Sequence, residues 1–259
     1  MEQTPQGQVD FWNRRAQTYP RYDDTPNSYT DKVISKIQAH GISFDSKSVL
    51  DVGAGSGQYT LKLAKLAKSV AALDISDQML AISQADAKRL GLTNIEYFLK
   101  PIDEFKAPEK FDLVFSSMCP AVRDDPSRRW FLDSAKEAAI YLGFLDYVYP
   151  GPMPRLMERY QVTRKLFNSG LEMEEWFKKI GENFSRYELN GEWVVKYQRD
   201  EALHWCLTML RDYGVTDPDR VFLDECLEPF KTPGSDEYVF KSPYFVDLLI
   251  WERKNSKLK

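Results

Sequence analysis

The sequence contains few of the side chains that metal sites and disulfide scaffolds require. Its 259 residues include 3 cysteines, Cys119, Cys206 and Cys226, and 2 histidines, His40 and His204. The cysteines form no C-x-x-C pair, and three scattered thiols cannot build a disulfide framework. We therefore expect neither a disulfide-stapled domain nor a metal cofactor.

Long apolar runs are also missing. The longest candidate, residues 245–251, includes Asp247 and is far shorter than the about 20 apolar residues of a membrane-spanning helix. Residues 1–6 are polar and lack the apolar segment of a signal peptide. We expect a cytoplasmic protein that does not act at a membrane.

The chain has no excess of positive charge. Lysine and arginine number 35 against 39 acidic residues, which gives a formal net charge of −4. Proteins that bind DNA or RNA usually carry a basic surface, so nucleic acid is not the expected partner. The hydrophobic fraction of 43% and the length suffice for the core of one large domain.

Short apolar runs alternate with helical segments through the first 150 residues. Strands are expected at 48–52, 70–74, 95–99, 111–115 and 139–144, and helices at 8–18, 28–40, 58–68, 76–90 and 125–138. Buried strands separated by helices of this length predict a doubly wound, mostly parallel sheet.

The pattern changes after Pro150. Helices are expected near 154–168, 172–181 and 199–213, the Asn190-Gly191 pair indicates a hairpin within 187–195, and two strands are expected at 238–240 and 244–251, joined by 241–243. The fold class that follows is α/β: a Rossmann-like sheet of seven strands with an antiparallel C-terminal edge strand and a partial helical cap.

Three regions are expected within this single domain. Residues 1–45 supply helices that form part of a lid over cofactor and substrate. Residues 46–150 form the Rossmann-like core, and residues 151–259 complete the sheet and add the cap elements.

The segment from Val49 to Gly57 carries the most informative motif. Gly53, Gly55 and Gly57 directly follow the first strand, where glycines permit positive φ and let a ligand approach the backbone closely. Asp74 ends the next strand, 17 residues beyond Gly57. In a doubly wound sheet a carboxylate at that place can accept both hydroxyls of a ribose, so we expect a nucleoside ligand.

Two cofactors fit such a site. Dinucleotide folds prefer G-x-G-x-x-G, but Gln58 stands where the third glycine belongs, and about 47 residues precede the first strand. These departures favour S-adenosylmethionine, which has no pyrophosphate. An NAD(P)-dependent oxidoreductase is the alternative.

On these motifs the sequence resembles the class I S-adenosylmethionine-dependent methyltransferases of the small-molecule type. The glycine-rich segment is followed by Asp74-Ile75-Ser76 with Met79-Leu80, by the fourth-strand segment 111–117, and is preceded by an aromatic helix at 11–16. The resemblance implies methyl transfer to a small-molecule acceptor with S-adenosylhomocysteine as the second product. A non-catalytic module that binds the cofactor has the same motifs and stays open.

The resemblance also implies roles for individual residues. Asp51 meets the cofactor's amino group, Asp74 binds the ribose, and the backbone of the glycine-rich turn borders the methionine part. The expected cofactor-binding residues are Asp51, Gly53, Ala54, Gly55, Asp74, Ile75, Met79, Ile102, Asp103 and Ser116. Pro101 stands where many members have an acid that binds the adenine, and Asp103 is the expected replacement.

Catalytic residues are less evident, because in-line methyl transfer depends mainly on alignment of donor and acceptor. The acceptor is expected near Met118, after the fourth strand. Cys119 is either a small buried residue or a polarisable contact or nucleophile. Asp124 is a candidate general base, whereas Asp125 is expected to cap the helix that follows. The proposed lid and substrate contacts are Trp12, Arg15, Tyr19 and Met118.

Overall fold

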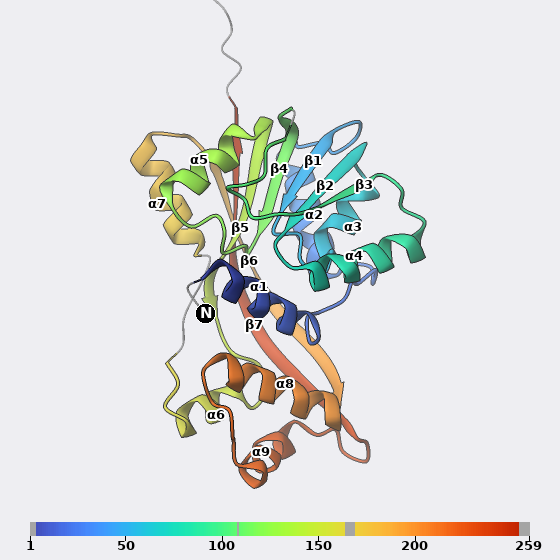
Figure 1. Ribbon diagram of the computed structural model, residues 1–259, viewed down its shortest axis with the longest axis vertical. Coiled ribbons are helices and arrows are strands. Elements are labelled where there is room, and N and C mark those ends of the chain that lie inside the picture. The colour runs from blue at the N-terminus through green and yellow to red at the C-terminus, as the bar shows by residue number, and fades with distance from the viewer. Residues whose placement is uncertain (1–3, 108, 164–168, 254–259) are drawn as a thin grey trace, which may run out of the picture. The chain divides into compact units, whose positions relative to one another are not determined.

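The computed structural model describes residues 4–253 except residue 108 and residues 164–168 (Figure 1). The helices are α1 (Pro5–Ala16), α2 (Tyr29–His40), α3 (Gln58–Ala64), α4 (Asp77–Leu90), α5 (Asp125–Asp133), α6 (Met153–Arg159), α7 (Gly170–Ile180), α8 (Arg199–Asp212) and α9 (Arg220–Leu227). The strands are β1 (Ser48–Val52), β2 (Ser69–Asp74), β3 (Ile95–Leu99), β4 (Phe111–Ser117), β5 (Ala135–Tyr147), β6 (Ser185–Gln198) and β7 (Glu237–Glu252).

The seven strands form one sheet in the order β3-β2-β1-β4-β5-β7-β6. Pairing is parallel from β3 to β5, with Val49 of β1 opposite Val70 of β2 and Leu113 of β4. Strand β1 is therefore central, and the order reverses there. Ligands of open α/β sheets bind at the carboxyl ends of the strands where the order reverses.

Helices cover both faces of the parallel part, as alternate residues of β2 show. Ala71 and Leu73 pack in one cluster with Phe131 of α5 and Phe177 of α7. Ala72, between them, packs on the opposite side with Leu80 of α4. Because successive strand residues face opposite sides, this split confirms the doubly wound α/β fold.

The chain divides into two compact units. Unit 2 comprises Tyr19–Leu145, Phe167–Leu189 and Val246–Lys259, and contains the parallel strands with α2, α3, α4, α5 and α7. Unit 1 comprises Met1–Thr18, Asp146–Leu166 and Asn190–Phe245. Its core includes Met153 of α6, Trp205 of α8, Leu223 of α9 and Phe240 of β7, all buried.

The expected hairpin at Asn190-Gly191 is wrong, because β6 runs through it as one strand. The glycine serves a different purpose: a Cβ at Gly191 would lie 2.4 Å from the hydroxyl of Tyr244. The residue is small so that a tyrosine of β7 can approach the backbone of β6.

The two expected C-terminal strands are likewise one, β7. Ser242 is buried and its hydroxyl donates to the Val148 carbonyl, so the segment around Pro243 stays extended instead of turning. Strand β7 also lies between β5 and β6, which leaves β6 at the edge. The last strand is therefore not the edge strand that we expected.

Two helical expectations also need correction. Helix α9 lies where we expected only a connection, and it begins because the Asp219 carboxylate accepts from the backbone N–H groups of Val221 and Phe222. Helix α6 ends at Arg159, and the rest of the expected 154–168 helix falls partly on residues 164–168, outside the described residues. Among the helices that are described, none combines the length and apolar character needed to cross a membrane.

Candidate functional site

The turn between β1 and α3 has the conformation that its glycines suggest. Gly53, Gly55 and Gly57 have φ values of +74°, +54° and +89°. Residues with a Cβ atom rarely adopt such positive φ values, whereas glycine adopts them readily. The backbone N–H groups of Gly53 and Ala54 donate to the Leu73 carbonyl at 2.8 and 3.0 Å. These bonds fix the turn against the end of β2.

Asp74 joins the turn to α4. Its Oδ2 accepts from the Gly55 backbone N–H at 2.8 Å, and its Oδ1 accepts from the Ser76 N–H at 2.9 Å. Burial raises the pKa of this carboxyl, and the backbone hydrogen bonds oppose that rise. Since a carboxylate has about four acceptor positions, the group can also receive a hydroxyl donor.

Asp51 lies at the other side of the turn and is 2% exposed. Its Oδ2 accepts from the Thr60 hydroxyl at 2.6 Å. Burial raises the pKa of Asp51 to about 7, against the lowering effect of the Thr60 hydrogen bond. A cationic group beside this carboxyl would lower its pKa and favour the ionised form.

Side chains pack closely against two of the glycines. A Cβ at Gly53 would lie 2.4 Å from Cys119 Sγ, and one at Gly57 would lie 2.2 Å from Ser83 Oγ. Cys119 is 7% exposed, and burial raises the pKa of its thiol to about 12. The thiol is therefore protonated at neutral pH and fills the space above the turn.

The segment Tyr19-Pro20 lies against the same turn. The buried Ser56 hydroxyl donates to the Pro20 carbonyl at 2.7 Å, and the Gln58 amide donates to it at 3.3 Å. A Cβ at Gly55 would lie 4.0 Å from the Tyr19 ring. Tyr19, expected in a lid, thus borders the turn, whereas the role of the Pro20 carbonyl gave no signal in the sequence.

The end of β4 adds a strained residue. Ser116 is buried and its hydroxyl donates to the Val52 carbonyl at 3.1 Å, which ties β4 to β1. Two residues later Met118 has a φ of +52°, a conformation costly for a residue with a side chain. Its backbone N–H donates to the Leu142 carbonyl at 2.8 Å, which holds it there.

The residues expected at the adenine end differ in accessibility. Met79, in the first turn of α4, is 1% exposed, and Ile75, which lies between Asp74 and the Ser76 cap of that helix, is half-buried. Ile102 packs against the core cluster that contains Phe105. Asp103 is exposed on the loop that follows Pro101.

Asp124, not Asp125, caps helix α5, which corrects our assignment of the cap. The Asp124 carboxylate accepts from the Ser127 N–H at 3.0 Å and from its hydroxyl at 2.6 Å. These hydrogen bonds hold the pKa of Asp124 below its usual value. Asp125 pairs instead with Arg129 at 2.7 Å and accepts from the Trp176 indole at 2.8 Å.

Trp12 and Arg15, the other expected lid residues, belong to unit 1. There the Arg15 guanidinium lies 3.8 Å from the Asp212 carboxylate, and the Trp12 ring packs edge-on against Phe11. Within unit 1, Arg15 thus contacts α8, and Trp12 contacts its neighbour in α1. Among the described residues, no three histidine, cysteine or acidic side chains are grouped closely enough to hold a metal ion.

Comparisons with known proteins match the part of the chain that contains this turn. Residues 49–139 match the family model of a methyltransferase domain. The release factor glutamine methyltransferase of Streptococcus pneumoniae is 34% identical over 124 residues, which are 47% of this chain and 43% of that protein. The malonyl-(acyl-carrier protein) O-methyltransferase of Bacillus cereus is 25% identical over 108 residues, 41% of this chain and 39% of that protein. The chain thus spans about two fifths of the length of the curated relatives it matches.

A solved structure extends the likeness beyond the matched segment. Magnesium protoporphyrin IX methyltransferase from Synechocystis PCC 6803, with SAH bound, aligns with a TM-score of 0.52 over 92% of this chain and 98% of that one. At 13% identity this alignment shows the fold. Residues 49–139, about a third of the chain, therefore match a methyltransferase domain, and the curated relatives that align with this chain are methyltransferases.

Proposed function

We propose that this protein transfers a methyl group from S-adenosylmethionine to a small-molecule acceptor by in-line displacement at the sulfonium. The observation that carries the proposal is the Asp74 carboxylate, held by the N–H groups of Gly55 and Ser76 at the carboxyl ends of β1 and β2. A ribose hydroxyl can donate to an acceptor position that those bonds leave on the carboxylate.

Residues near the glycine-rich turn could bind the methionine part and the adenine of the cofactor. The buried Asp51 suits the cationic amino group of the methionine part, and the backbone of Gly53 to Gly55 borders it. We assign the apolar surface against the adenine to the half-buried Ile75, because Met79 is 1% exposed. The position of these residues close to Asp74 and the chemistry of their side chains support these roles.

Neither of the two candidate catalytic side chains is suited to act as a base or a nucleophile. Asp124 already caps α5, and hydrogen bonds hold the pKa of its carboxyl low, which makes it a poor base. The Cys119 thiol is buried and protonated, which disfavours a nucleophilic role. We therefore assign catalysis to alignment of donor and acceptor near Met118.

A small molecule is the acceptor class that the sequence favours. The names of the relatives indicate different methyl acceptors. One is a release factor glutamine methyltransferase, and another is a malonyl-(acyl-carrier protein) O-methyltransferase. This chain has no excess of basic residues for a nucleic acid, and Met118-Cys119-Pro120 follows β4 where nucleic-acid amine methyltransferases often have Asn/Asp-Pro-Pro-aromatic.

Calorimetric titration with S-adenosylmethionine, S-adenosylhomocysteine and NADH tests the cofactor. Binding of the first two and not of NADH supports the proposal, whereas binding of NADH alone would overturn it in favour of an oxidoreductase. Cofactor binding without turnover across a broad acceptor screen would favour a non-catalytic binding module.

The Asp74→Ala variant tests the central residue. Loss of a desolvated, charge-assisted hydrogen-bond partner costs about 2–4 kcal/mol, or roughly 30-fold to 1000-fold in affinity for S-adenosylmethionine. Asp45→Ala is the matched control, because it removes the same charge from an exposed loop before β1. A folded Asp74→Ala protein with unchanged affinity would refute the assignment.

A further inference from the structure

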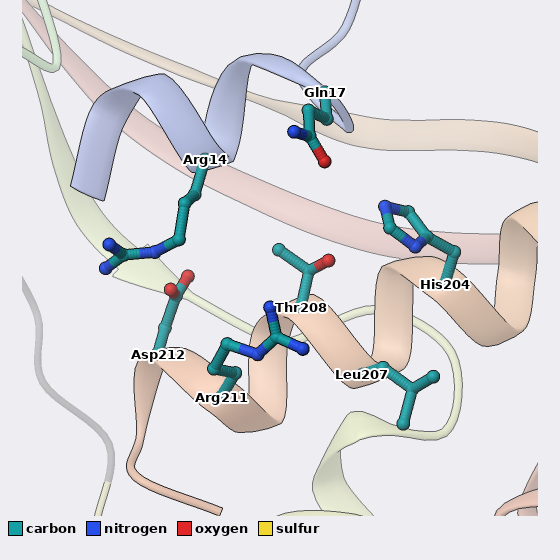
Figure 2. A pocket seen from close by; sticks show the side chains of 7 residues that line it. All are labelled: Arg14, Gln17, His204, Leu207, Thr208, Arg211 and Asp212. Atoms are coloured by element: carbon teal, nitrogen blue, oxygen red, sulfur yellow. The ribbon is translucent and has the colours of Figure 1, made fainter. Parts of the chain in front are cut away.

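Helices α1 and α8 of unit 1 line a small cavity, open to solvent, that the proposed methyl transfer does not use. Its volume is about 140 Å³, and its lining side chains are Arg14, Gln17, His204, Leu207, Thr208, Arg211 and Asp212 (Figure 2). Pockets that take whole small molecules begin at about 300 Å³, so this one suits a single functional group.

The lining is rich in hydrogen-bond donors. Arg14 and Gln17 come from the last turn and the end of α1, and Figure 2 shows them across from His204, Thr208 and Arg211 on one face of α8. Arginine presents a planar fork that matches the oxygens of phosphates and carboxylates. Each of the two helices contributes an arginine to the lining of this one small space.

The charges inside the cavity do not cancel. Asp212 is the single acidic residue of the lining, and its carboxylate lies 3.8 Å from the guanidinium of Arg15, a third arginine beside the cavity. Arg14 and Arg211 form no ion pair within the described part of the chain. The cavity therefore carries net positive charge when it is empty.

Arg14 adds a separate indication. Its Nε is buried and has no hydrogen-bond partner among the residues that the structure describes. A buried polar group without a partner costs free energy that a bound acceptor would recover. The positions of Arg14 and Arg211 in the last turns of their helices favour positive charge, but they explain neither the cavity nor the unpartnered nitrogen.

We propose that this cavity is a binding site for a tetrahedral oxyanion, with the guanidinium groups of Arg14 and Arg211 as its two principal ligands. Gln17, Thr208 and His204 offer further donors at its rim. The anion is either free phosphate or the phosphate group of a larger molecule, and both share this chemistry. The inference does not depend on methyl transfer.

Calorimetric titration with inorganic phosphate at low ionic strength tests the site, with sodium chloride of equal ionic strength as the reference. We expect saturable binding of phosphate and none of chloride. Absence of saturable phosphate binding to the wild-type protein would overturn the proposal, and this outcome requires no variant to fold.

Three variants locate the binding. Because a hydrogen bond to a charged group is worth about 1.5–3 kcal/mol, Arg14→Gln and Arg211→Gln should each weaken phosphate binding at least about tenfold. Arg220→Gln removes the same charge from an exposed position at the start of α9 and should leave binding unchanged. An equal loss in all three would show a general charge effect and refute the site.

Glycerol phosphate distinguishes the two sources of the anion. Affinity similar to that of inorganic phosphate, with the same dependence on Arg14 and Arg211, indicates a site for the phosphate of a larger molecule. Binding of inorganic phosphate alone indicates a site for the free ion. If glycerol phosphate binds equally well to the two arginine variants, the ligand lies elsewhere and the proposal fails.

Discussion

The raised pKa of Asp51 leads to a prediction about the pH dependence of cofactor binding, which rests on the proposed function. Burial places this pKa at about 7, so the free protein holds a proton there below neutrality. The amino group of S-adenosylmethionine is a cation below about pH 7.7 and needs the ionised carboxylate. Binding must therefore release the proton, and affinity must rise with pH through this range.

The magnitude follows from the ionised fraction of Asp51. With a pKa of about 7, the fraction is one half at pH 7 and about one eleventh at pH 6, a change of about fivefold in affinity. Each further unit of acidification should weaken binding about tenfold. Titrations between pH 5 and pH 7.5, in buffers of different ionisation enthalpy, measure both the affinity and the proton released.

Two comparisons isolate the residue. The Asp51→Asn variant should bind more weakly at pH 7.5 and show little dependence on pH, because its side chain cannot titrate. Adenosine lacks the amino acid part of the cofactor and should show a shallower dependence. An affinity for S-adenosylmethionine that stays constant from pH 5 to pH 7.5, or a slope retained in Asp51→Asn, would refute the reasoning.

Three further outcomes test the surroundings of the site. Gly57→Ala should lower the free energy of unfolding by about 2–4 kcal/mol in urea titrations, since it adds strain at positive φ to a clash with Ser83; a change below about 1 kcal/mol would contradict the packing. Asp124→Ala should lower the free energy of unfolding by about 1 kcal/mol through loss of the α5 cap, and it should change the rate of methyl transfer by no more than about twofold. A large loss of turnover in a variant of normal stability would instead indicate that Asp124 acts as a base. Cys119 should react with a thiol reagent at pH 8 only after unfolding, because its thiol is buried and its pKa is about 12; rapid modification of the native protein, located by mass spectrometry, would show otherwise.

The parallel half of the fold was predictable because its signals are local. Strand β3 coincides with the expected residues, and the apolar run of β1 ends at glycines that have the expected positive φ. Buried parallel strands need continuous apolar sequence, and glycine is the residue that permits such a turn. Both requirements can be seen within a few residues.

The second half was less predictable because its requirements come from distant residues. Gly191 looks like a turn residue, yet it is small because Tyr244, 53 residues later, packs against it. Similarly, Ser242 holds β7 extended by bonding to Val148. No local pattern distinguishes a glycine that turns the chain from one that makes room for a neighbour.

The same limit applies within the site. Asp124 and Asp125 are adjacent acids before the same proline, and only the Ser127 contacts show which one caps the helix. The carbonyl of Pro20 meets Ser56, 36 residues away, through the backbone, which carries no side-chain signature. The chemistry of the turn was visible in the sequence, but its supporting contacts were not.

The composition of unit 1 from three separated stretches has a consequence for synthesis on the ribosome. Arg15 of α1 contacts Asp212 of α8, 197 residues further along the chain. At about 5–20 residues per second, roughly 10–40 s pass between the synthesis of the two partners. An isolated helix of 12 residues is marginal in water, so α1, although it is made before the other described helices, is among the last of them to become stable.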